Sequence, residues 1–410
     1  MFVTIPDSLI QEALRSPHSA GALYGRLRDE GDVAQVRGLD PDSGDELGRW
    51  GIGAPPDEIA RAIPELGAGH IFISLSAEPH PAAQAYRLEN QQLQPVQIDI
   101  IRLQADYTAR MNGLFEPGAL ADARVAVIGL GSGGSVVAAQ LARCGVGHMR
   151  LVDPDRLETH NIARHVCGLR DIGRYKTRAV RDLLRDISPL VAVETYEADI
   201  LARPEILAEV VAGCDLVVAA TDTEESKIAI NRACWPLGIP AVYGAAYNRA
   251  FGGDIFRALP PDGACYDCFQ QVVVEHFGSP PPAASDFSPG YADPSRMADL
   301  IAEPGLAMDV GVIALLLARV ALMVLLRGQT TTLPELPENW LLFGNRAGWI
   351  FEKPLESLFI DVPKRPDCPT CNYEGYVREH LGMSADEARA AAEALLAQLL
   401  TTDPQEPEHT

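Results

Sequence analysis

The sequence predicts an α/β fold: a mainly parallel sheet with helices on both faces, preceded by a small N-terminal α/β or α+β domain. From Arg124 onward, apolar strand-like runs alternate with helical stretches, which is the pattern of a parallel sheet covered on both faces. The first of these runs ends in a glycine-rich turn, VAVIGLGSGGS, which leads into a helical stretch. Residues 1–100 lack this alternation, so we expect them to form a separate domain.

The N-terminal region, residues 1–100, has few structural signals. It contains one helical segment, SLIQEALRS, and one strand-like run from His70 to Leu75, separated by a stretch rich in Gly, Asp and Pro. These signals do not specify a topology. His18, His70 and His80 show neither the HxH nor the HExxH spacing of a metalloprotease site, so we expect them to have no metal.

The main domain is expected to span residues 101–376. The runs VAVIGLG, HMRLVDPD, VAVETYEADI, CDLVVAATD and IPAVYGAAY are predicted strands, and the stretches between them are predicted helices. A crossover loop rich in Pro, Ser and Asp, residues 279–306, is followed by an apolar helix and by strand-like pieces near NWLLFG and GWIFEKP. Residues 377–410 are expected to form a helix from about Ser384, its N-cap, to Leu400, and then a disordered tail.

The composition excludes several classes of partner. The net charge is −22 at pH 7, which argues against a nucleic-acid or anionic-membrane surface because either needs clustered Lys and Arg. The most apolar segment, Gly311 to Leu326, is shorter than the roughly 20 residues that span a bilayer, and Arg319 interrupts it. The N-terminus lacks the pattern of a secretory signal. We therefore expect a cytoplasmic protein that acts on a protein or a small molecule.

The glycine-rich turn predicts a nucleotide site. Gly129, Gly131 and Gly134 fit G-x-G-x-x-G between a strand and a helix, as in Rossmann-like folds, where backbone N–H groups and the helix N-terminus approach phosphate oxygens. The next predicted strand ends at Asp153, the place where an acidic side chain meets ribose hydroxyls. NAD and ATP fit these features equally well.

The residues that follow Asp153 favour ATP. A site that holds and cleaves a triphosphate needs more positive charge than a dinucleotide site, and it needs a carboxylate for the metal. Polar and charged groups follow the turn in three stretches, DPDRLETHNIARH, GRYK and AATD. The candidates that they supply are Asp155, Asn161, Arg164, Lys176 and Asp222.

These motifs, in this order, resemble the adenylating domain of the ThiF/MoeB and ubiquitin-activating enzyme family from about Arg110 to Cys371. The resemblance implies that Asp153 holds the ribose of ATP and that Asp222 binds Mg²⁺. It also implies that an arginine before the first strand enters the partner protomer's site. Arg110 is the candidate for that arginine, and Arg102 is the alternative. The residues implied to contact the phosphates are Asn161, Arg164 and Lys176, with Asp155 in the same nucleotide site.

Each of these residues also has a structural interpretation. Asn161 could cap the turn that follows it, Arg164 and Lys176 could be solvated helix residues, and Asp222 could be the N-cap of the helix ESKIAINRACW. The occurrence of all four in the expected order favours the functional interpretation.

Two CxxC pairs predict a zinc site. Cys265 with Cys268 and Cys368 with Cys371 supply four thiolates, enough for one closed tetrahedral site. Such a zinc ion would be structural and would clamp the C-terminal segment onto the sheet domain. Redox-active pairs are the alternative. The resemblance supports zinc, because many family members carry it in a similar arrangement.

The remaining cysteines bear on covalent chemistry. In the family that the chain resembles, a sulfur nucleophile often lies in the crossover loop, but residues 279–306 contain no cysteine. Cys144 and Cys234 are expected in the core, and Cys167, close to Arg164, is the best remaining thiol. Ser285 and Ser288 in the loop could form an ester instead.

The resemblance implies ATP-dependent adenylation of the C-terminal carboxylate of a ubiquitin-like modifier, followed by transfer to a conjugating enzyme or another acceptor. It further implies a homodimer, a recognition role for residues 1–100 and, by analogy with bacterial conjugation operons, a link to antiviral defence. The alternatives are a peptide-modifying adenylyltransferase with a short peptide substrate, an NAD-dependent oxidoreductase indifferent to loss of Asp222, and an inactive binding scaffold. The expected cofactors are ATP, Mg²⁺ and Zn²⁺.

Overall fold

The computed structural model describes residues 1–53, 70–76, 82–89, 92–102, 107–116, 118–188, 191–277 and 305–391. The chain divides into two compact units, Met1–Asn112 and Gly113–Thr410. The serines proposed for an ester, Ser285 and Ser288, lie outside the described residues, as do residues 392–410.

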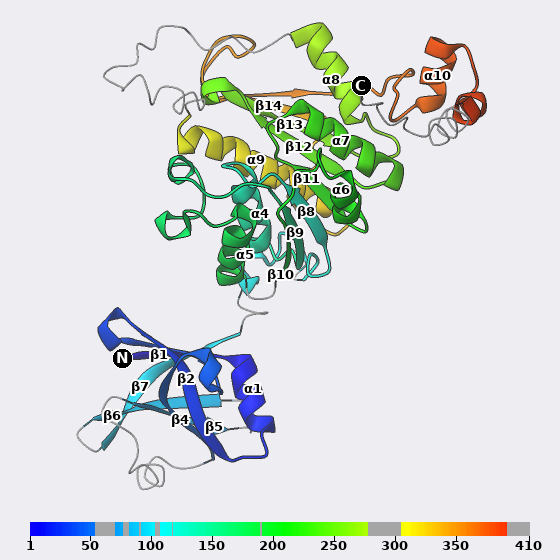
Figure 1. Cartoon of the computed structure of the whole chain (residues 1–410). Helices are drawn as coiled ribbons and strands as arrows, with labels where there is room; N and C mark the ends of the chain where they lie inside the picture. The colour runs from blue at the N-terminus through cyan, green and yellow to red at the C-terminus, as the bar shows by residue number, and fades with distance from the viewer. Residues whose placement is uncertain are drawn as a thin grey trace, which may run out of the picture. The chain divides into compact units, whose positions relative to one another are not determined.

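In the residues that the structure describes, the N-terminal unit is a sheet of seven strands that closes on itself, with the helix α1 packed against it (Figure 1). The strand order is β1-β3-β2-β4-β5-β6-β7, and β7 pairs again with β1. Ile10 and Ala13 of α1 are buried with Ile5, Leu23 and Trp50 in one core. The elements are β1 (Phe2–Pro6), α1 (Asp7–Arg15), β2 (Ala20–Arg28), β3 (Val33–Gly38), β4 (Asp45–Ile52), β5 (Ile71–Ser76), β6 (Ala82–Glu89) and β7 (Gln92–Ile101).

The single strand expected in this unit, at 70–75, is present as β5, but the other strands were not predicted. The stretch rich in Gly, Asp and Pro, for which no strand was predicted, contains β4. Gly48 of β4 has φ +152, and a Cβ there would lie 1.8 Å from the Ile71 carbonyl oxygen of β5. The glycine marks a close approach of two backbones rather than a loop.

The second unit contains an eight-stranded mixed sheet, in the order β10-β9-β8-β11-β12-β13-β14-β15. The strands from β10 to β12 are parallel, and β13, β14 and β15 are antiparallel. Its strands are β8 (Arg124–Ile128), β9 (His148–Val152), β10 (Ala192–Tyr196), β11 (Leu216–Ala219), β12 (Ala241–Ala246), β13 (Gly252–Ala258), β14 (Trp340–Gly344) and β15 (Glu356–Ile360). The predicted Rossmann-type α/β unit is therefore present, with more antiparallel sheet than we expected.

Helices cover both faces of this sheet (Figure 1). On one face α9 packs against α4, β12 and β13. The helix α9 lies so close to β12 that a Cβ at position 244 would be 2.5 Å from the Leu317 side chain. Glycine at this position permits the close approach. On the other face Tyr243 of β12 meets Tyr266 of α8, with ring centroids 4.3 Å apart. The helices are α4 (Gly134–Arg143), α5 (Lys176–Ile187), α6 (Pro204–Val211), α7 (Glu224–Cys234), α8 (Tyr266–Val272), α9 (Ala307–Leu325) and α10 (Tyr373–Leu381).

The apolar segment forms α9, which has 19 residues and is long and apolar enough to cross a membrane by length and composition alone. Half of its most apolar window is buried inside the protein, as in a core helix. Met308 and Leu315 are exposed, at 74% and 50%. Among the described residues, the helix therefore has one face in the core and one exposed face, which carries Met308, Leu315 and Arg319.

Two details of the C-terminal region differ from the sequence prediction. The strand expected at GWIFEKP is instead β15, a few residues later, because Gly348 and Trp349 both adopt positive φ and turn the chain. The helix α10 was not predicted. The helix expected from Ser384 begins as predicted, with the Ser384 hydroxyl accepting from Glu387 N–H at 3.3 Å, and it is described over 385–391.

Candidate functional site

The glycine-rich turn lies between β8 and α4, at the carboxyl edge of the parallel strands. The strand order reverses between β8 and β11, which is where ligands bind in open α/β sheets. Gly129 has φ +88, and a Cβ there would lie 2.6 Å from the Ala220 carbonyl oxygen that follows β11. A Cβ at Gly134 would lie 1.9 Å from the Gly129 oxygen. These two glycines are needed for packing.

Unlike Gly129 and Gly134, the glycines at 131 and 133 are not packed against neighbouring backbone atoms in the described part of the chain. A Cβ at either position would meet no heavy atom of the described residues within 4 Å, and neither has positive φ. The turn is thus open beside Gly131 and Gly133 and leads directly into the N-terminus of α4. Backbone N–H groups and open space at a helix N-terminus suit a phosphate group, so the turn fits the phosphates of a nucleotide.

The two kinds of glycine give a testable difference in stability. We expect Gly134→Ala to destabilise the unit by about 1–3 kcal/mol, because the new methyl overlaps the Gly129 carbonyl oxygen. Gly131→Ala is expected to change stability by less than about 0.5 kcal/mol, because its methyl enters open space. Denaturant unfolding of both variants measures the difference. Equal losses would contradict the assignment of the open space to a ligand.

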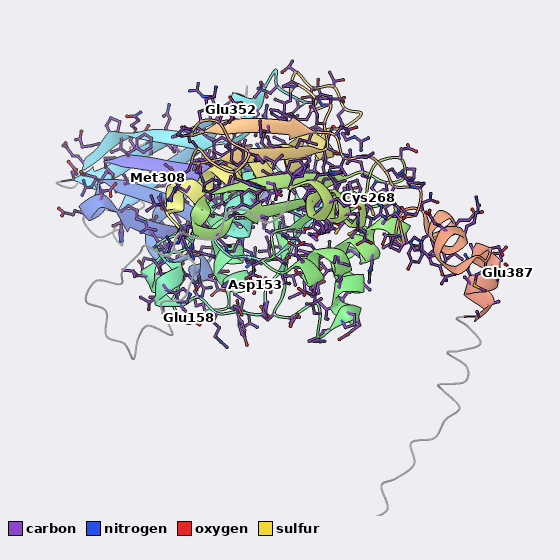
Figure 2. All side chains as sticks on the ribbon, turned by 90° about the horizontal axis from the view of Figure 1, so that it is seen from above. Asp153, Glu158, Cys268, Met308, Glu352 and Glu387 are labelled. Carbon is purple, nitrogen blue, oxygen red and sulfur yellow. The ribbon has the colours of Figure 1, made fainter. Side chains whose placement is uncertain are left out.

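Asp153 holds the turn in place. Its Oδ2 accepts a hydrogen bond from Leu130 N–H at 2.7 Å, and its Oδ1 accepts one from Asp155 N–H at 2.9 Å. The residue is only 6% exposed, and it lies directly after β9 (Figure 2). Among the described residues, Oδ2 accepts only the Leu130 hydrogen bond and keeps a lone pair for a ribose hydroxyl, so the structural role does not exclude the predicted one.

Lys176, the first residue of α5, is buried against this carboxylate. Its Nζ lies 2.8 Å from Asp155 Oδ2 and 3.5 Å from Asp153 Oδ1. Burial lowers the pKa of Lys176, but the hydrogen bond to Asp155 and the charges of both carboxylates outweigh burial and leave the pKa raised. Lys176 is therefore a charged, 8% exposed residue, not the solvated helix residue of the alternative interpretation.

His165 also contacts the turn. Its Nε2 lies 2.9 Å from the Leu130 carbonyl oxygen, and its Nδ1 accepts from Cys167 N–H at 3.0 Å. The sequence contained this residue within the motif but gave it no role. No pattern signals a histidine that bonds to two backbone groups, because only the folded chain brings those groups together.

Asn161 and Arg164 lie in the same segment, after β9. The Asn161 Oδ1 accepts from Glu158 N–H at 2.9 Å, so its side chain closes the turn Thr159–Asn161 rather than capping the turn after it. Arg164 is half-buried, and its Nη1 would lie 3.5 Å from a Cβ at Gly305, just before α9.

Asp222 follows β11, on the strand beside β8. It is exposed, and among the described residues it makes no hydrogen bond or ion pair. The alternative interpretation of Asp222 as the N-cap of α7 is wrong. The N-cap is Thr223, whose hydroxyl oxygen accepts from Ser226 N–H at 3.4 Å. A free carboxylate at this edge fits a Mg²⁺ ion that keeps most of its waters and bridges to phosphates.

A polar cluster beside Asp222 was missing from the prediction. Lys227 of α7 is 3% exposed, with its Nζ 3.2 Å from Glu224 Oε1. Tyr266 donates to Glu224 Oε2 at 2.7 Å, and Asp254 of β13 accepts from Trp340 Nε1 at 3.3 Å. Burial raises the pKa of Asp254 to about 6, against the lowering effect of Lys227. The Tyr266–Glu224 bond joins α8 to α7, and the Trp340–Asp254 bond joins β14 to β13.

Arg110 lies in a short 3-10 turn, Ala109–Met111, and is exposed. Arg102, the alternative, is exposed after β7. Both residues fall in the unit Met1–Asn112.

The four cysteines of the CxxC pairs come together. Their Sγ atoms all lie within 4.8 Å of one another, and Cys265, Cys268 and Cys368 are buried. The Arg365 N–H donates to Cys268 Sγ at 3.4 Å, the kind of backbone bond that orients a thiolate ligand. The cluster joins α8 to the segment before α10, and Cys268 lies apart from Asp153 (Figure 2). Four converging sulfurs fit a structural Zn²⁺ ion.

The other cysteines do not have the features of a reactive thiol. Cys167 is 5% exposed, and burial, with the charge of Asp171, raises its pKa to about 12. A nucleophilic cysteine instead has a lowered pKa and access to solvent. Cys234 is buried in the core as expected, and Cys144 is half-buried at the end of α4.

The N-terminal unit has a cavity of about 510 Å³ beside α1 and β2. Its lining includes the polar side chains of Glu12, Arg15 and His18 and the ring of Trp50.

The α/β sheet and the glycine-rich turn together identify the class of protein, a nucleotide-binding α/β domain. Residues 109–345 match the ThiF family. A SAMP-activating enzyme E1 of Haloferax volcanii is 31% identical over 261 residues, which cover 63% of this chain and 83% of that enzyme. The chain belongs to the ThiF family, and it is a ThiF/MoeB-like enzyme of the ubiquitin-activating type.

In other relatives the aligned region is a smaller share of the relative's own length. A ubiquitin-like modifier-activating enzyme 5 of Oryza sativa subsp. japonica is 27% identical over 283 residues, 66% of this chain and 60% of that protein. Among solved structures, E. coli MccB with ATP is similar to the chain with a TM-score of 0.47 and 19% identity, over 62% of this chain and 68% of that one.

Proposed function

We propose that the protein binds MgATP and adenylates the C-terminal carboxylate of a ubiquitin-like modifier. The observation that carries this proposal is the convergence of three groups at the carboxyl edge of β8, β9 and β11. They are the open glycine turn, the Asp153–Asp155–Lys176 cluster and the free carboxylate of Asp222. The family membership and the names of the relatives support the choice of reaction.

In the proposed reaction a modifier carboxylate oxygen attacks the α-phosphorus of ATP, a P–O bond forms, and pyrophosphate leaves with the electrons of the broken bond. The carboxylate is already ionised at neutral pH, so no general base is needed. The residues of the chain act by placing the reactants and by neutralising charge. The turn and the α4 N-terminus bind phosphate oxygens, and Asp153 binds the ribose.

Cationic and amide groups complete the proposed site. Lys176 stays charged because of its carboxylate partners and would turn toward the phosphates with Asn161 and Arg164. Asp222 would hold Mg²⁺, which supplies charge neutralisation on the phosphates when bound. Arg110 would enter the site of a second copy in a homodimer, with α9 near the shared core.

The N-terminal unit, proposed as residues 1–100, would recognise the modifier or a conjugating enzyme. Its cavity, beside α1 and β2, is the candidate surface. Cys167 would not take the adenylate, since it is buried with a raised pKa. The proposed acceptor is therefore a group outside this chain, and an ester on Ser285 or Ser288 is the alternative. The cytoplasm is the proposed compartment, and antiviral conjugation systems are the proposed context.

The proposal is tested by ATP–pyrophosphate exchange with small modifier proteins whose genes lie beside this one. We expect exchange that depends on both MgATP and a modifier with a free C-terminus. Exchange with a short peptide but with no modifier would instead indicate a peptide-modifying adenylyltransferase. Binding of NAD without exchange would indicate an oxidoreductase.

The shared site of a homodimer has its own test. Arg110→Ala and Asp222→Ala are each expected to be inactive, because each removes charge neutralisation from every site. If Arg110 acts in the partner's site, a mixed dimer has one site with both residues intact. Mixing the two variants should therefore restore up to about a quarter of the wild-type exchange rate after subunits re-equilibrate. A mixture as inactive as its components would contradict the role of Arg110.

A further inference from the structure

We propose that His165 is a positioning residue that fixes the glycine-rich turn for nucleotide binding by holding the Leu130 carbonyl group while Asp153 holds the Leu130 N–H. This inference rests on the proposed function, because it assigns how the turn is kept ready for phosphates. His165 is not among the residues that the sequence motifs assign to ATP.

Each of the two peptide groups that flank Leu130 is held by one side chain. The Leu130 N–H donates to Asp153 Oδ2 at 2.7 Å, and the Leu130 carbonyl oxygen lies 2.9 Å from His165 Nε2. The Leu130 side chain is fully buried. Rotation of the backbone at Leu130 would break one or both bonds, so the two side chains together fix the direction of the N–H groups that follow.

The proton on His165 can be assigned from its two partners. The Cys167 N–H donates to Nδ1 at 3.0 Å, so Nδ1 carries a lone pair in the neutral ring. The proton then lies on Nε2, which donates to the Leu130 carbonyl oxygen. Burial lowers the pKa of His165 and Lys176 lowers it further, while the Leu130 bond, Asp153 and Asp171 raise it; the net shift is downward. The ring is therefore neutral at pH 7.

This geometry separates positioning from catalysis. Both ring nitrogens are occupied by backbone groups, so neither is left for a substrate or for proton transfer. The ring instead restricts the backbone conformation of the turn at Leu130. Gly129, Gly131, Gly133 and Gly134 surround Leu130, and glycine loses more conformational freedom on ordering than any other residue. Without a clamp, the turn would have to be ordered when the nucleotide binds, at a cost in affinity.

Two neutral variants that differ by one methylene test the proposal. In His165→Gln the side-chain amide nitrogen can occupy the place of Nε2 and keep the bond to the Leu130 oxygen. In His165→Asn the side chain can keep only a contact at the place of Nδ1. The comparison changes neither charge nor polarity, and thermal unfolding of both variants should remain close to the wild type.

The readouts are the Kd of MgATP by titration calorimetry and the steady-state constants of ATP–pyrophosphate exchange. We expect His165→Asn to raise the Kd and the KM for ATP about tenfold, with kcat and the KM for the modifier changed less than about twofold. His165→Gln should bind MgATP within about threefold of the wild type. The proposal would be overturned if His165→Asn bound MgATP as tightly as the wild type, or if His165→Gln bound it as weakly as His165→Asn.

A second readout does not depend on ATP. Amide hydrogen exchange of a peptide that covers Leu130–Ser132, in the unliganded protein, should be faster in His165→Asn than in the wild type and His165→Gln. Equal exchange in all three proteins overturns the clamp. If the wild type fails to bind MgATP while this difference in exchange is present, the proposed function fails and the positioning role of His165 stands.

Discussion

Asp222→Ala is expected to lower ATP–pyrophosphate exchange by about 10²-fold or more while the protein remains folded. The carboxylate is the proposed Mg²⁺ ligand, and loss of a group that stabilises charge in the transition state has an effect of this size. The fold should be unaffected, since Asp222 is exposed and has no hydrogen-bond or ion-pair partner in the described part of the chain. Exchange kinetics and circular dichroism measure the two properties.

Glu225→Ala is the matched control for Asp222→Ala. Glu225 is an exposed carboxylate three residues later, in the first turn of α7, and its removal changes the net charge equally. Its exchange rate should stay within about twofold of the wild type. Normal exchange in Asp222→Ala would refute the adenylation assignment, and equal losses in both variants would show that the effect is one of net charge.

Replacement of the cysteine ligands is expected to remove one zinc ion per chain and to lower the melting temperature by about 10 °C or more. The four Sγ atoms lie within 4.8 Å of one another. A bound zinc ion would be coordinated by all four thiolates at once. Zinc binding by such a site contributes directly to folding free energy. Cys265→Ser combined with Cys268→Ser removes half of the ligands. Elemental analysis and calorimetry measure the outcome.

The control for the zinc prediction is Cys144→Ser, since Cys144 is a half-buried thiol outside the cluster. It should keep its zinc and a melting temperature within a few degrees of the wild type. A purified wild-type protein without metal, with a Cys265–Cys268 or Cys368–Cys371 disulfide by mass spectrometry, would support redox pairs instead. The zinc site and Asp222 lie on different elements, so one prediction can fail without the other.

The sequence alone predicted the central unit because its signals are local. A strand, a glycine turn and a helix are adjacent in the chain, and Gly129, Gly131 and Gly134 mark the turn directly. The alternation of apolar runs predicted β8, β9, β10, β11 and β12. The CxxC spacing predicted the cysteine cluster, because the backbone between two such cysteines already places both sulfurs near one ion.

Only the tertiary structure decided which contacts hold the site together. The closed sheet of the N-terminal unit depends on pairings between distant strands, such as β1 with β7. The close approach that requires glycine at position 48 exists only because the fold brings Ile71 beside it. His165 gained its role from the Leu130 carbonyl group, 35 residues earlier in the chain. The sequence determined the residue types and local geometry of the site. The fold determined which backbone groups those side chains reach, because these contacts join segments that share no local pattern.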